Sequence, residues 1–151
     1  MKRGYLMNKL EQAMNVELSN WAVLYVKLHH LHWYVTGPHF PVLHAKFEEL
    51  YDLAADKLDE LAERILTIGG TPASTMKEFL ALATLEEADK GGSESDMLEA
   101  TVRDLKALAA GLDRVAKLAE DEAGDRATAD LLVGQVGELQ KQIWLLTATL
   151  S

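Results

Sequence analysis

Apolar residues recur along the first third of the chain in alternating steps of four and three, the spacing that places side chains on one face of an α-helix. Glu17 occupies one turn of this stripe. The pattern predicts a helix from Leu6 to Thr36, which Gly37 and Pro38 end because glycine suits the position after a helix and proline cannot continue it. The stripe consists of Leu10, Met14, Trp21, Leu24, Leu28, Leu31 and Val35.

A second stripe predicts a helix from Pro41 to Ile68. Gly69 and Gly70 close this helix just before Pro72. Each of the two helices would be roughly 40–45 Å long at about 1.5 Å per residue. The second stripe consists of Leu43, Phe47, Leu50, Ala54, Leu61 and Ile65.

The second half of the chain also predicts long helices, which follow one long connection. A short helix, Met76–Leu82, precedes a loop, Glu86–Ser95, that is rich in Gly, Ser and acidic residues. A third long helix is predicted over Asp96–Gly124, with Glu99 in capping-box register, and a fourth over Asp125–Leu150. The sequence contains no sustained strand alternation. It therefore predicts an all-α four-helix bundle with a short helix in a long middle crossover.

Composition agrees with one globular domain. The chain has 151 residues, of which 48% are hydrophobic and 26% charged, so we expect a single domain over residues 1–151 with a short tail at residues 1–5. We expect neither a signal peptide nor a membrane span, because no apolar stretch has the required length. The predicted location is the cytoplasm.

Cysteine content and charge restrict the chemistry. There is no cysteine, so a metal ion would be held by nitrogen and oxygen ligands from His, Asp and Glu. The net charge of −9, from 24 acidic and 15 basic residues, opposes a phosphate backbone and favours cations as partners. We therefore do not expect direct DNA binding.

All five histidines fall between residues 29 and 44. His29, His30 and His39 have no carboxylate at a useful helical spacing, and we interpret them as ordinary surface and turn residues. His32 borders the apolar stripe of the first helix, whereas His44 has Glu48 one turn later on the same helical face. His44 and Glu48 could share a cation.

A second acidic pair, Asp59 and Glu63, lies further along the same predicted helix. Taken alone, such pairs are usually solvated helix surface. His44 and Asp59 are fifteen residues apart, about 22 Å along a helix, so one ion cannot bind both. Either there are two poor sites, or two antiparallel copies share one complete site at each end of a two-fold interface. The Glu-x-x-His motif of bundles that bind two irons in their own core is absent from the sequence.

These motifs resemble the Dps family, the mini-ferritins or DNA-binding proteins from starved cells, and in particular its Listeria and Bacillus type. The similar segments are HWYVTGPHFPVLH at residues 32–44, Glu48, DELAER at 59–64 and GGTP at 69–72. The resemblance implies a ferritin-like four-helix bundle, with twelve copies in a hollow shell and metal sites at two-fold interfaces. It assigns as iron ligands His32, His44 and Glu48 of one subunit, with Asp59 and Glu63 of its neighbour.

The resemblance also implies a ferroxidase that oxidises Fe(II), preferably with hydrogen peroxide, stores the ferric mineral and protects the cell from oxidative damage. Zinc would be a competitor for the iron site. Trp33 matches an aromatic residue beside the family's site and could donate electrons, although simple packing would also explain it. Asp121 and Asp130 match the acidic pore through which iron enters, although they could equally be helix caps or loop charges. The alternative is a non-enzymatic, DNA-compacting or structural shell of the same architecture.

Overall fold

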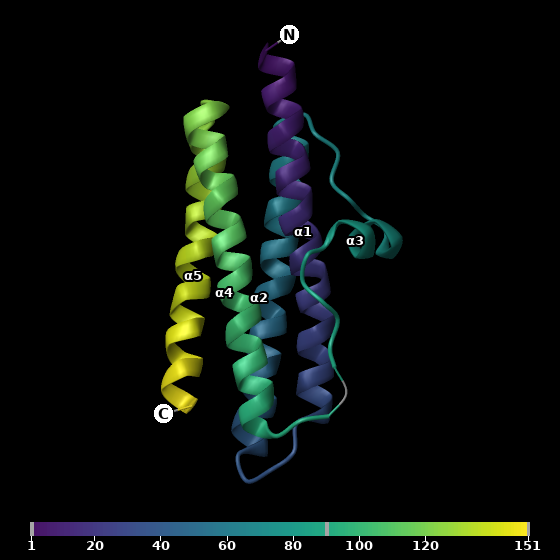
Figure 1. Ribbon diagram of the computed structural model, residues 1–151, viewed down its shortest axis with the longest axis vertical. Coiled ribbons are helices and arrows are strands. Elements are labelled where there is room, and N and C mark those ends of the chain that lie inside the picture. Colours follow the sequence, from purple (N-terminus) through teal and green to yellow (C-terminus); the bar gives the residue numbers. More distant parts are fainter. Residues whose placement is uncertain (1, 90, 151) are drawn as a thin grey trace.

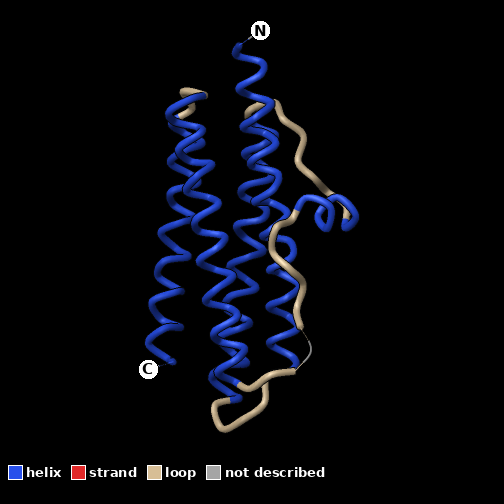
Figure 2. Tube along the Cα trace, viewed as in Figure 1, coloured by secondary structure: helices blue, strands red, loops and turns tan. Residues whose placement is uncertain are grey.

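Four long helices lie side by side in the computed structural model, which describes residues 2–89 and 91–150, with side chains from residue 8 (Figure 1). They are α1 (Lys2–Tyr34), α2 (Phe40–Thr67), α4 (Glu94–Lys117) and α5 (Arg126–Leu150). The short helix α3 (Met76–Leu82) lies in the connection between α2 and α4. Every regular element of the described residues is helical (Figure 2). The predicted fold class is confirmed.

The long crossover sets the directions of the helices. In Figure 1, α1 descends, α2 returns, and the chain over residues 68–89 passes beside α1 before α4 begins at the lower end. As a result α2 and α4 run in the same direction. The junction of α1 and α2 and the start of α4 lie at the same end of the bundle, which is also the end that carries the histidines. None of the described helices is both long and apolar enough to cross a membrane.

The boundaries of α2, α3 and α5 lie within one residue of those predicted. Two helix starts were predicted wrongly. Helix α1 begins at Lys2, so the expected tail is helical over residues 2–5, while Met1 lies outside the described residues. Helix α4 begins at Glu94 because Ser93 forms its capping box: Ser93 Oγ accepts from Asp96 N at 3.1 Å, and Ser93 N donates to Asp96 Oδ2 at 3.0 Å.

The end of the third long helix also differs from the prediction. Helix α4 stops at Lys117 and continues as one wide π-helical turn, η1 (Leu118–Glu122), instead of running as α-helix to Gly124. The Asp125 amide then donates to the Ala119 carbonyl at 2.7 Å. Single π turns are rare, and the spacing of apolar residues gave no reason to expect one here.

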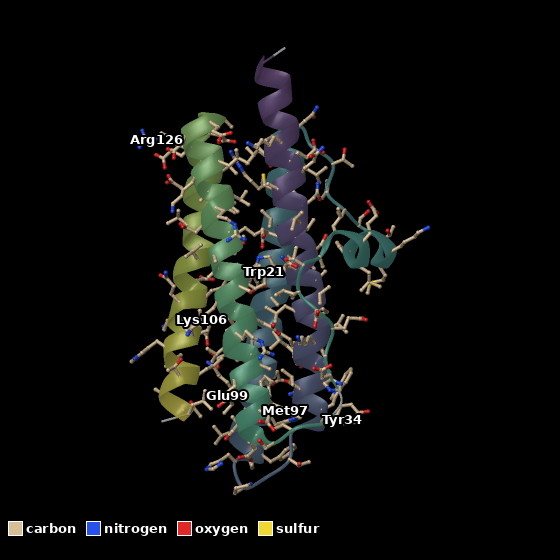
Figure 3. All side chains as sticks on the ribbon, in the orientation of Figure 1. Trp21, Tyr34, Met97, Glu99, Lys106 and Arg126 are labelled. Atoms are coloured by element: carbon tan, nitrogen blue, oxygen red, sulfur yellow. The ribbon has the colours of Figure 1, made fainter. Side chains whose placement is uncertain are left out.

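The core forms where the apolar stripes of the four helices meet. Trp21, labelled at mid-height in Figure 3, is buried there, and its Nε1 donates to Gln135 Oε1 at 3.0 Å. Gln135 Nε2 in turn donates to the Lys57 carbonyl at 3.3 Å. This buried network joins α1, α5 and α2 and satisfies polar groups that would otherwise be costly to bury.

Glu17, the acidic residue within the first stripe, is buried beside a glycine of α4. Only 5% of Glu17 is exposed, and a Cβ atom at Gly111 would overlap its carboxylate oxygens. Glycine therefore makes room for the carboxyl group. Burial raises the pKa of Glu17, while the hydrogen bond from Asn20 (3.2 Å) and the charge of Arg114 partly oppose this effect.

We expect Glu17→Gln to make stability less dependent on pH. The raised pKa means that, above the ordinary value of 4.5, native Glu17 binds more proton than unfolded Glu17, so its contribution to stability falls as pH rises. The variant should therefore gain stability relative to wild type between pH 4 and 7, as measured by urea unfolding. Glu99→Gln, which removes an exposed carboxyl of α4, is the control. A difference between Glu17→Gln and wild type that is the same at every pH would contradict the prediction.

Candidate metal centre

His32 and His44 meet across the junction of α1 and α2 and bind each other reciprocally. His32 Nδ1 donates to the His44 carbonyl at 2.6 Å, and His44 Nδ1 donates to the His32 carbonyl at 2.8 Å. The chain thus brings together two of the predicted ligands that lie twelve residues apart. The arrangement joins the last turn of α1 to the second turn of α2.

The end of α1 explains why one of these carbonyl groups is available. His32 lies in the last four residues of α1, whose carbonyl oxygens have no amide partner within the helix. A carbonyl can only accept, so Nδ1 of each imidazole must carry the hydrogen. Each neutral ring then keeps its lone pair on Nε2, the atom that can bind a metal ion.

The two imidazole rings are held firmly. They stack with centroids 3.6 Å apart and planes 14° apart, and Phe40 stacks on the outer face of the pair, 5.0 Å from His44. His32 is only 8% exposed, whereas His44 is partly exposed. Stacking and hydrogen bonds therefore fix both rings before any ion arrives, which lowers the entropic cost of binding.

Glu48 and Tyr51 extend this site along α2. Glu48 is exposed and lies one turn after His44, and its Oε1 accepts from the Tyr51 hydroxyl at 3.1 Å. The Tyr51 ring meets His32 edge-on, with centroids 5.3 Å apart. Partial burial and the Glu48 carboxylate raise the pKa of the Tyr51 phenol, which therefore remains a donor at neutral pH. Tyr51 was not among the predicted site residues, although its position seven residues after His44 places it on the same helical face.

Trp33 is connected to the histidine pair through other rings. It is 66% exposed and lies 5.5 Å from His29, which stacks on Tyr51 at 3.8 Å. His29 Nδ1 also donates to the Tyr25 carbonyl at 2.8 Å. The interpretation of His29 as an ordinary surface residue is therefore wrong, because it is part of an ordered ring cluster that reaches His32.

Asp59 and Glu63 lie elsewhere on the surface of α2. Both are exposed and line an open hollow of ≈ 480 Å³ with Asp56, Glu60, Arg64, Thr67 and Leu131. Arg64 donates to Thr128 Oγ1 (2.9 Å) and to Asp125 Oδ1 (3.4 Å), which directs its charge toward α5. The two carboxylates therefore remain open to solvent on a strongly acidic face.

One copy of the chain does not assemble the full predicted ligand set. His44 and Asp59 lie on one continuous helix, about 22 Å apart at 1.5 Å per residue. Among the described residues, no three side chains of His, Asp or Glu gather closely enough to hold a metal ion. The structure brings His32 and His44 together, leaves Glu48 one turn away, and holds Asp59 and Glu63 apart from all three.

The two remaining histidines have different surroundings. His39 is an exposed turn residue, as predicted, and as the N-cap residue of α2 it also pairs with Glu94 at 2.8 Å. His30 Nε2 is buried without a hydrogen-bond partner, beside Val26 and Leu80 in a pocket between α1 and α3.

The predicted pore residues lie at the opposite end of the bundle from the histidines. Asp121 lies in η1 and Asp130 in the second turn of α5, and both are exposed. Acidic neighbours have local roles: Glu122 pairs with Lys9 at 3.1 Å, and Asp125 Oδ1 accepts from Thr128 N at 3.0 Å. The pore role of Asp121 and Asp130 stays a prediction.

Comparison with known proteins defines the family. A family model for the ferritin-like domain matches residues 11–151. DNA protection during starvation protein 2 of Bacillus anthracis is 44% identical over 146 residues, covering 96% of this chain and 99% of the relative. The crystal structure of a Dps protein from Bacillus brevis matches with a TM-score of 0.94 and 43% identity, covering 97% of this chain and 98% of that one.

A more distant structure carries information about the superfamily. The Dps protein from Vibrio cholerae O1, described as a member of a broad superfamily of ferritin-like diiron-carboxylate proteins, matches with a TM-score of 0.92 and 33% identity. The match covers 97% of this chain and 92% of that one. In each of these comparisons, the match covers more than nine-tenths of this chain and of the related protein. This chain therefore belongs to the Dps family of ferritin-like proteins.

Proposed function

We propose that this protein is a ferroxidase and iron store whose Fe(II) site is shared between two copies of the chain. His32, His44 and Glu48 of one copy would bind Fe(II) together with Asp59 and Glu63 of a second copy. The observation that carries the proposal is the reciprocal pairing of the two histidines, which leaves two Nε2 atoms for a metal ion. The solvent-open carboxylates lie about 22 Å away on the same helix, so antiparallel copies would bring complementary halves together.

The donor set suits an iron ion that changes valence. Imidazole nitrogen accepts Fe(II), while hard carboxylate oxygens favour the Fe(III) product. The acidic face around Asp59 and Glu63 also raises the local concentration of cations. Imidazole and carboxylate bind zinc as well, so zinc would compete for the same residues.

Hydrogen peroxide is the proposed oxidant. Two Fe(II) ions each give up one electron, the O–O bond of the peroxide breaks, and with two waters the products are two FeO(OH) and four protons. Because both electrons enter one peroxide molecule, no hydroxyl radical is released. Trp33, connected to His32 through the rings of His29 and Tyr51, would be a reserve electron donor when only one Fe(II) is available.

A storage function requires a closed assembly. Twelve copies of 16.7 kDa would form a shell of roughly 200 kDa with the ferric mineral inside. Asp121 and Asp130 would line the pores through which iron enters. With a net charge of −9 per chain, we do not propose direct DNA binding, and protection of the cell in the cytoplasm would come from removing iron and peroxide.

An anaerobic Fe(II) titration followed by separate additions of peroxide and oxygen tests the function. We expect saturable Fe(II) binding, oxidation much faster with peroxide than with oxygen, and loss of both in a His32→Asn, His44→Asn variant. Asparagine keeps a side-chain N–H donor for the carbonyl bonds but removes Nε2. Oxidation no faster than in buffer would favour a non-enzymatic shell, and absence of saturable binding would favour a purely structural bundle.

A further inference from the structure

A carboxylate from a distant part of the chain forms two hydrogen bonds to the turn between α1 and α2. Glu94 Oε1 accepts from the His39 backbone N–H at 2.8 Å, and Glu94 Oε2 pairs with His39 Nδ1, also at 2.8 Å. Glu94 lies at the start of α4, fifty-five residues away in sequence, and its side chain is only 15% exposed. One side chain therefore binds both the backbone and the ring of the N-cap residue of α2.

The turn is shaped to receive this carboxylate. Gly37 has a φ of +132°, and a Cβ atom there would overlap the Glu94 carboxylate. Glycine therefore allows both the backbone conformation and the close approach. The N-cap residue of α2, His39, caps no amide of its own helix with its side chain, so the ring is available to Glu94.

The same turn separates the two members of the metal-binding pair. Its first residue, Val35, is 1% exposed and anchored in the core, and its amide donates to the Leu31 carbonyl at 3.0 Å. His32 lies three residues before Val35, and His44 lies five residues after His39. The reciprocal hydrogen bonds, from each ring to the backbone carbonyl of the other histidine, thus depend on how the turn positions the end of α1 relative to the start of α2.

We infer that Glu94 is a positioning residue for the His32 and His44 pair, acting through the turn that His39 closes. This inference rests on the proposed function. The hydrogen bond from His39 lowers the pKa of Glu94, which keeps it a carboxylate at neutral pH. Glu94 itself has no part in binding iron. Its contribution is to keep the imidazole rings of His32 and His44 in their relative positions before Fe(II) binds.

Loss of this contact should weaken Fe(II) binding without changing the chemistry. In Glu94→Ala we expect the Fe(II) concentration for half-maximal peroxide-dependent oxidation to rise about tenfold, the usual scale for outer-sphere supports of metal ligands. The maximal rate should stay close to that of wild type, because every residue that contacts iron remains. Amide hydrogen exchange in residues 35–44 should become faster in the metal-free shell.

Two further variants separate positioning from a general effect of charge. Glu94→Gln should restore affinity, because the amide oxygen accepts from the His39 backbone and the amide nitrogen can donate to the other tautomer of the ring. Glu99→Ala removes an exposed carboxylate five residues further along α4 and should leave both readouts at the wild-type level. Wild-type affinity in Glu94→Ala, or an equal loss in Glu99→Ala, would overturn the inference. A wild-type shell that takes up no Fe(II) would instead overturn the proposed function, and the inference with it.

Discussion

Shells co-assembled from two inactive variants should recover about a quarter of the wild-type rate of peroxide-dependent iron oxidation. One variant carries His32→Asn with His44→Asn, and the other carries Asp59→Ala with Glu63→Ala. Each alone should be nearly inactive. Random mixing makes about half of the two-fold pairs mixed, and each mixed pair has intact histidines opposite intact carboxylates at one of its two sites.

A site contained within one chain would recover nothing, because every copy would bring its own defect. Co-assembled shells that are shown by native mass spectrometry to contain both variants, yet are no more active than either parent, would exclude the shared site. The matched control is Glu49→Ala with Asp52→Ala, which removes the same charge from the exposed face of α2 between the two half-sites. This control should keep the wild-type rate.

The largest loss of stability is expected from breaking the ion pair between Lys27 and Asp104. Lys27 Nζ lies 2.7 Å from Asp104 Oδ2, both side chains are 10% exposed, and the same ammonium donates to the Glu86 carbonyl at 2.9 Å. The pair joins α1, α4 and the crossover. Asp104→Leu would leave a buried charge without compensation and should cost about 3–5 kcal/mol in the free energy of unfolding.

Replacing both partners should reverse most of this loss. In Lys27→Met with Asp104→Leu no buried charge remains, and apolar side chains of similar volume can pack in its place. Denaturant unfolding at one protein concentration measures the differences. Asp113→Leu is the control, since Asp113 and Lys117 form an exposed pair at 3.1 Å that should contribute less than about 0.5 kcal/mol. A double variant as unstable as Asp104→Leu would show that the charge itself is required.

The helices were predictable because their signals are local. Spacing of apolar residues identified α2 and α3 to within one residue. Gly37 and Pro38 indicated the end of α1, which lies at Tyr34, two residues before the predicted end at Thr36. One error arose where two local signals compete. Ser93 and Asp96 can both cap a helix, and the structure uses Ser93, which lengthens α4. A single π turn such as η1 is rare, and the apolar spacing before it gave no signal for it.

The sequence by itself determined the all-helical bundle, the nitrogen and oxygen chemistry, and the length of helix that separates His44 from Asp59. These follow from periodicity, composition and a fixed rise per residue, which depend on neighbours along the chain. Only the tertiary structure decided that His32 and His44 exchange carbonyl hydrogen bonds, that His29 and Tyr51 form a ring cluster beside them, and that Glu94 closes the turn on His39. Those contacts join residues on different helices, and their geometry is set by how the helices pack.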